Sequence, residues 1–126
     1  MIEYYFQSFL LRISSSAIVQ ARQITLDART SSLGFVRGTI IFSDESQLHI
    51  RELVETEPVT IRIAYSYHYQ QLSGNFIFRY DNTPHFPHLP SHPHHKHVGD
   101  KRIVIATEPP DLNSVLDEIE RMPNWN

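Results

Sequence analysis

The chain lacks cysteine, carries only four glycines, and has no apolar run that approaches the roughly 20 residues of a membrane-spanning helix. Without cysteine, disulfides, thiolate metal sites and a cysteine nucleophile are excluded, which fits a reducing cytosol. No glycine-rich phosphate-binding loop occurs, and a net charge of −3 excludes a global basic field for nucleic acid or an acidic membrane. We therefore expect a cytoplasmic protein that does not bind membranes, with any nucleic-acid contact confined to a local patch.

The spacing of apolar residues predicts one α+β domain over residues 1–126. Apolar residues recur at the spacing of an amphipathic helix over residues 2–13 and 111–122. Between residues 17 and 81 the period changes to two, which predicts a curved antiparallel meander of about five strands. We expect the two helices to cover its aromatic face, and a long loop rich in proline and histidine to follow over residues 82–99.

The last two predicted strands form a hairpin and determine which side chains share a face. Pairing their aromatic residues across a short turn sets Tyr69 opposite Phe76. His68 and Arg79 are then diagonal neighbours on the opposite, polar face, and Asp81 ends the fifth strand. The fourth strand is predicted to carry on its apolar face Val59, Ile61, Ile63, Tyr65, Tyr67 and Tyr69.

The segment 82–99 holds six of the eight histidines and four of the eight prolines. Proline has no backbone N–H and fixes φ, so its repetition predicts a stiff, extended loop and argues against a helix or a central strand. Histidine exchanges protons near neutral pH and is the commonest metal ligand. The loop therefore marks a candidate site that extends to the polar face of the hairpin.

One use of this site is the cleavage of RNA without a metal ion. Such a reaction needs a base for the 2′-hydroxyl, an acid for the leaving oxygen and cations for the phosphate. Imidazoles provide the acid and the base, and a carboxylate orients an imidazole. The catalytic candidates are His68, Asp81, His85, His94, His95 and His97, and the substrate-binding candidates are Arg79 and Lys96.

Two other uses of the loop stay open. In an extended segment residues two apart point the same way, which pairs His92 with His94 on one side and His95 with His97 on the other. Zinc, nickel or copper binds such imidazoles in a metal-dependent hydrolase. Against this use, the chain has no His-Glu-x-x-His motif, and Lys96 places a cation among the histidines. We therefore expect no cofactor beyond incidental zinc or nickel on the loop. The other use is non-catalytic, as a protein-binding module in which the loop packs over the sheet.

Several short motifs form a pattern typical of one protein family. They are Gly34–Gly38, Tyr65–Gln70, Phe78–Asn82, Pro84-His85, Pro93–Gly99, Glu108–Leu112 and Val115–Ile119. Together they resemble the TumE family, small bacterial and archaeal proteins assigned as toxins of type II toxin–antitoxin pairs. The resemblance implies a growth-inhibiting toxin neutralised by a cognate antitoxin, usually one with a DNA-binding helix-turn-helix. His88 departs from the family pattern, because we expect an acidic residue at that position.

Overall fold

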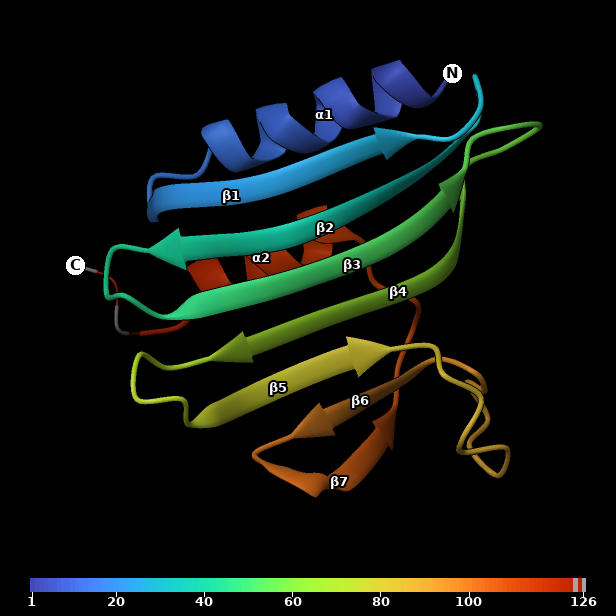
Figure 1. Cartoon of the computed structure of the whole chain (residues 1–126). Helices are drawn as coiled ribbons and strands as arrows, with labels where there is room; N and C mark the ends of the chain where they lie inside the picture. Colours follow the sequence, from blue (N-terminus) through green and yellow to red (C-terminus); the bar gives the residue numbers. More distant parts are fainter. Residues whose placement is uncertain (124, 126) are drawn as a thin grey trace.

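The computed structural model describes residues 1–123 and 125, except for the side chain of Lys101. Within these residues, two helices and seven strands follow one another in the order α1, β1 to β7, α2 (Figure 1). Their bounds are α1 Ile2–Ser14, β1 Val19–Ala28, β2 Leu33–Phe42, β3 Gln47–Glu55, β4 Ile61–Gln70, β5 Phe76–Asp81, β6 His95–Val98, β7 Asp100–Ala106 and α2 Leu112–Glu120. The predicted α+β class and both predicted helices are confirmed.

All seven strands form one twisted antiparallel meander in which each strand pairs with the next along the chain (Figure 1). The sequence predicted about five strands and a loop over 82–99, so the strand count is wrong by two. The segment from His95 to Ala106 forms β6 and β7, and β6 lies between β5 and β7. Pro93 is the last proline of the segment, so the backbone from His95 onward keeps the N–H groups that strand pairing needs.

The two helices cover one face of the sheet, with α1 along β1 and α2 behind β2 and β3 in the view of Figure 1. Burying one such apolar side chain stabilises the fold by about 1.5–3 kcal/mol. The helix residues in the core are Ile2, Phe6, Phe9 and Ile13 of α1 and Leu112, Val115, Leu116 and Ile119 of α2. Asp111 caps α2 in a reciprocal capping box with Ser114.

A β-bulge in β4 overturns part of the predicted apolar face. The register with β3 shifts beside Val54, so that Arg62 takes the position opposite Val54. Tyr65, Tyr67 and Tyr69 are buried as predicted, but the predicted placement of Val59, Ile61 and Ile63 is wrong. These three side chains are 62%, 52% and 51% exposed. Residues before the bulge therefore lie in the opposite phase from the tyrosines.

The hairpin of β4 and β5 has the predicted faces but a register shifted by two residues. Tyr69 pairs with Phe78 rather than Phe76, because the connection is a five-residue loop preceded by a bulge and not a short turn. A shift of two residues leaves every side chain on its face. His68 and Arg79 are consequently direct cross-strand partners instead of diagonal neighbours.

Glu52 of β3 is a buried carboxyl group on the helix-covered face, with 2% exposure. It accepts hydrogen bonds from the hydroxyls of Tyr5 on α1 and Tyr67 on β4. Burial raises the pKa of Glu52, and this effect exceeds the opposing effect of the two tyrosine hydrogen bonds. The carboxyl group thus connects α1 to two strands, and folding favours its protonated form relative to the unfolded chain.

Glu52→Gln should remove a pH-dependent loss of stability. The folded protein holds the Glu52 proton above the ordinary pKa of 4.5, where the unfolded chain has released it. The free energy of unfolding should therefore fall as pH rises through this range, and the variant should lack that contribution. Urea denaturation between about pH 5 and about pH 8 measures the difference. The exposed Glu3→Gln serves as the control, and equal slopes for wild type and Glu52→Gln would contradict this account.

Candidate functional site

The sheet face opposite the helices, here called the open face, carries two polar rows that cross the strands. Residues that pair directly across neighbouring strands point to the same face, so each chain of partners forms one row. The first row is Thr39, His49, His68, Arg79, His97 and Val104. The second row is Arg37, Arg51, Ser66, Asp81, His95 and Ala106.

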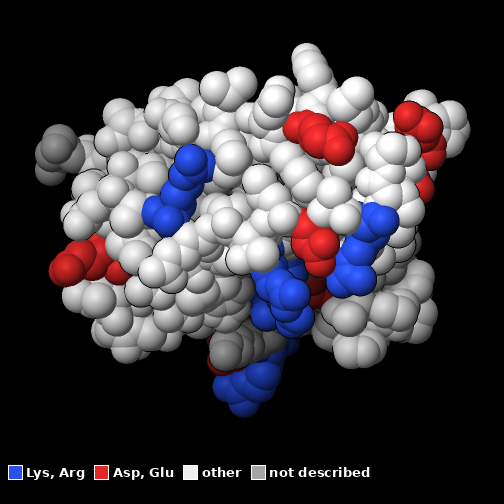
Figure 2. All heavy atoms as spheres, turned by 45° about the horizontal axis from the view of Figure 1, so that its top comes forward, with Lys and Arg blue, Asp and Glu red and all other residues white. Residues whose placement is uncertain are grey.

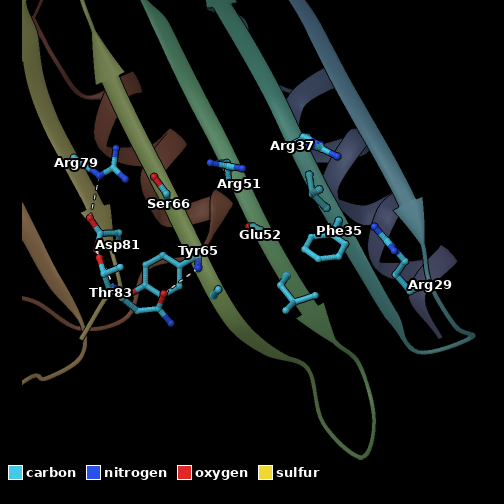
Figure 3. Close-up of a pocket in the computed structure, with 14 residues that line it drawn as sticks. Arg29, Phe35, Arg37, Arg51, Glu52, Tyr65, Ser66, Arg79, Asp81 and Thr83 are labelled. Atoms are coloured by element: carbon cyan, nitrogen blue, oxygen red, sulfur yellow. Dashed lines mark hydrogen bonds and ion pairs between the residues drawn. The ribbon is translucent and has the colours of Figure 1, made fainter. Parts of the chain in front are cut away.

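Asp81 is the centre of this site and is only 4% exposed. Its Oδ1 accepts hydrogen bonds from the backbone N–H of Thr83 at 3.0 Å and from the Thr83 hydroxyl, and lies 2.9 Å from Nε2 of His95. Its Oδ2 accepts from Nε of Arg79 at 3.0 Å and lies 3.7 Å from Nε2 of His97 (Figure 3 shows the contact with Arg79). One carboxylate therefore contacts groups from β5, from the loop that follows β5 and from β6.

The environment of Asp81 favours its charged form. Burial alone would raise the pKa of this carboxyl group, but hydrogen bonds from Thr83 and Arg79 and the nearby His95 outweigh that effect. The resulting pKa lies below the ordinary value of 3.8. Asp81 is thus a carboxylate at neutral pH and attracts the cations around it.

His95 is enclosed behind Asp81, with 1% exposure. Its Nδ1 lies 3.0 Å from the carbonyl oxygen of Pro93, and its Nε2 faces Asp81. Both neighbours are acceptors, so both contacts are hydrogen bonds only when the ring carries both protons. Phe86 of the loop packs edge-on against the ring, with centroids 4.7 Å apart. The geometry gives His95 the position of a buried support for Asp81.

His68 and His97 lie on either side of Arg79 in the first row. Neighbouring strands are about 4.8 Å apart, so β4 and β6 place the two imidazoles on backbones roughly 10 Å apart with the guanidinium between them. The His97 side chain is 16% exposed and that of Arg79 is 42% exposed. This arrangement leaves the partly exposed Arg79 guanidinium between two imidazoles.

Three of the residues predicted for the site lie elsewhere. Alternation along β6 turns Lys96 to the helix side, where its Nζ binds Oε2 of Glu118 at 2.7 Å and lies 4.8 Å from the Tyr80 ring centroid. His94 turns its Nδ1 to the Tyr65 hydroxyl at 2.8 Å, and burial, aided by the charge of Arg62, lowers its pKa. His85 is exposed in the loop after β5.

Asp81, His95 and His97 have the donor types of a metal site, and their ligand atoms lie within 4.8 Å of one another. The hydrogen bonds that Asp81 already accepts leave little room for a bound metal ion. Thr83 and His95 already occupy Oδ1, and the Arg79 guanidinium occupies Oδ2 at 3.0 Å. A metal ion would have to displace a fixed cation, so the residues fit a charged hydrogen-bond network better than a metal centre.

The arginines of the second row were not among the predicted site residues. A hollow of about 470 Å³ on the open face is lined by, among others, Arg29, Phe35, Arg37, Arg51, Ser66 and Arg79 (Figure 3). Their outward positions in β2 and β3 were available from the alternating pattern, but their alignment with Asp81 depends on the register of four strands. On the face drawn in Figure 2, lysine and arginine side chains lie among acidic and many uncharged residues.

The fold and the site together define a class: small α+β proteins with histidines and arginines on the exposed face of an antiparallel sheet. A family model described as toxin TumE matches residues 7–123, and the chain belongs to this family. The resemblance noted from the motifs is therefore confirmed, and membership of a toxin family implies a cognate antitoxin. Comparison with curated proteins and with solved structures gives no match. Among the described residues, no helix is long and apolar enough to cross a membrane.

Asp81→Asn should lower the free energy of unfolding by about 1–3 kcal/mol at neutral pH, because His95 and Arg79 lose their charged partner. The pKa of Asp81 is lowered in the folded state, so its contribution is present above pH 3.8 and is lost as pH falls through the lower folded pKa. The difference between wild type and variant should therefore shrink on acidification, measured by urea denaturation.

The matched control is Asp100→Asn. Asp100 forms an exposed pair with Arg102 at 2.9 Å, two residues along the strand as in the Asp81–Arg79 pair. Exposed ion pairs contribute little, so this variant should match the wild type at every pH. Equal stability of Asp81→Asn and Asp100→Asn at neutral pH would show that Asp81 does not hold the site together.

Proposed function

We propose that this chain is the toxin of a type II toxin–antitoxin pair and that it cleaves RNA without a metal ion at the row His68, Arg79 and His97. The observation that carries the proposal is the guanidinium of Arg79 between two imidazoles on the open face. Two groups that exchange protons near neutral pH and one fixed cation are the parts that this reaction needs.

The reaction divides between the two imidazoles. One imidazole removes the proton of a 2′-hydroxyl while its oxygen attacks the adjacent phosphorus. The bond from phosphorus to the 5′ oxygen breaks, and the other imidazole, protonated beforehand, gives its proton to the departing oxygen. The products are a 2′,3′-cyclic phosphate and a 5′-hydroxyl. Arg79 binds the non-bridging oxygens as negative charge develops on them.

The position of the Asp81 carboxylate supports an assignment of the two roles. This carboxylate lies 3.7 Å from Nε2 of His97, and a carboxylate stabilises an imidazolium, so we assign His97 as the acid and His68 as the base. Asp81 and His95 act as positioning residues, because their polar atoms are already engaged with each other and with Arg79 and Thr83. His85 and His94 take no part in this scheme, and Lys96 serves the contact with α2.

The antitoxin is the expected partner and, by the family resemblance, carries a helix-turn-helix. The family match predicts that expression of the chain arrests growth and that the co-expressed antitoxin relieves the arrest. This result would support the toxin assignment. Relief of arrest without any RNA cleavage by the purified chain would instead favour the non-catalytic binding module. Cytoplasmic action follows from the proposed substrate, because cellular RNA is in the cytoplasm.

A second candidate function is a metal-dependent hydrolase, favoured by the proximity of Asp81, His95 and His97. The two functions differ in their response to a chelator. Cleavage that persists in EDTA supports the acid–base reaction, whereas cleavage that EDTA abolishes and zinc restores supports the metal centre.

Alanine substitution of either histidine in the row should strongly slow cleavage without unfolding the protein. His68→Ala and His97→Ala each remove one proton-transfer group, so cleavage of total RNA in EDTA should slow by about a hundredfold or more. His92→Ala removes an exposed loop histidine outside the row and should cleave as the wild type does. Circular dichroism checks that the variants stay folded. Wild-type cleavage by either folded row variant would remove that residue from the mechanism.

A further inference from the structure

We infer that the toxin binds single-stranded RNA along the second row of the open face, with Arg51 and Arg37 on phosphates and Phe35 against a base. This inference rests on the proposed function, since it names the form of the RNA that reaches Arg79. The three residues lie outside the catalytic row, on β2 and β3, and line the same hollow as Arg79 and Asp81 (Figure 3).

Arg37 and Arg51 form a pair of like charges on the open face. Arg37 and Arg51 are direct partners across β2 and β3, where two like charges destabilise a sheet. Both are exposed, and within residues 1–123 and 125 no hydrogen bond or ion pair joins either side chain to an acidic residue. A bound anion removes this repulsion, so the pair has the arrangement of an anion site.

The second row crosses four neighbouring strands, from β2 to β5. Figure 3 shows Arg37, Arg51, Ser66 and Arg79 in a line across β2, β3, β4 and β5. Arg37 and Asp81 are three strands apart in the second row, a separation of roughly 14 Å at about 4.8 Å for each strand. The guanidinium groups of Arg37 and Arg51 in the second row continue toward that of Arg79 in the catalytic row, across the same hollow. Such a series of cations fits a polyanion with repeated charges, which a nucleic-acid backbone provides.

The aromatic ring of Phe35 lies beside the arginines of the second row. Phe35 is half-buried on the open face two residues before Arg37, and the guanidinium of Arg29 lies 4.9 Å from its ring centroid. Bases of single strands stack on aromatic rings and on guanidinium planes, whereas the bases of a duplex are already stacked on one another. Phe35 and Arg29 therefore favour a single strand over a duplex.

The binding test uses a fluorescent single-stranded RNA of about ten nucleotides, with 2′-O-methyl groups that prevent cleavage, and measures anisotropy at several salt concentrations. Arg37→Gln and Arg51→Gln should each weaken binding and reduce the slope of log K against log salt by about 0.7. Phe35→Leu should weaken binding about tenfold without changing that slope. Arg22→Gln is the matched control, because Arg22 pairs with Ile40 and lies on the helix-covered face.

Several outcomes would overturn the inference. Equal slopes for Arg37→Gln, Arg51→Gln and Arg22→Gln would show that the row does not contact phosphates. Tighter binding of a duplex of the same sequence would reject a single strand. Binding of poly-glutamate but not of RNA would assign the row to an acidic protein segment. Thermal unfolding confirms that the exposed substitutions leave the protein folded.

His97→Ala separates this inference from the proposed function. The variant should bind the methylated strand as tightly as the wild type does and fail to cleave the unmodified strand. If His97→Ala still cleaves while Arg51→Gln loses binding, the catalytic assignment fails and the binding row stands. If His97→Ala loses cleavage while Arg51→Gln binds normally, the binding row fails and the catalytic assignment stands.

Discussion

The pairing of β6 with β5 around the buried carboxylate of Asp81 is the constraint on which the candidate site depends. This pairing sets His95 opposite Asp81 and His97 opposite Arg79, so a carboxylate and a guanidinium from one strand meet two imidazoles from the next. Thr83 and Pro93, just outside the two strands, satisfy the remaining hydrogen bonds. The site is therefore held by backbone pairing as well as by side-chain charge, which restricts its geometry more than a loop would.

One face of the sheet is buried in the core, and the other carries the polar residues of the candidate site. The helices and the tyrosines of β4 bury one face, which also encloses Glu52. The open face carries the two polar rows, and no helix among the described residues covers it. Lys96 shows how strictly alternation separates the faces, since it lies between His95 and His97 in the sequence and contacts α2. Closeness in the sequence alone therefore does not place two residues in the same site. Residues of one strand share a face only when they are an even number of positions apart.

Local periodicity predicted both helices, an antiparallel meander over residues 17–81 and the polar face that His68, Arg79 and Asp81 share, because these features depend on residues near one another in the chain. The register of β4 with β5 and the position of Ile63 depended on bulges that no side-chain pattern marks. The predicted loop was extended beyond Pro93, the last proline of the segment, and so included the residues that form β6. The alignment of Arg37 with Asp81 required the registers of four strands together, which periodicity within one strand does not contain.

The chemical ends of the RNA fragments test the central claim most directly. A defined RNA is incubated with the purified chain in EDTA, and mass spectrometry identifies the termini produced. Attack by a 2′-hydroxyl between His68 and His97 predicts a 2′,3′-cyclic phosphate and a 5′-hydroxyl, and no cleavage where the 2′-hydroxyl is replaced by hydrogen. Fragments with a 3′-hydroxyl and a 5′-phosphate, or cleavage only with added divalent metal, would contradict the account.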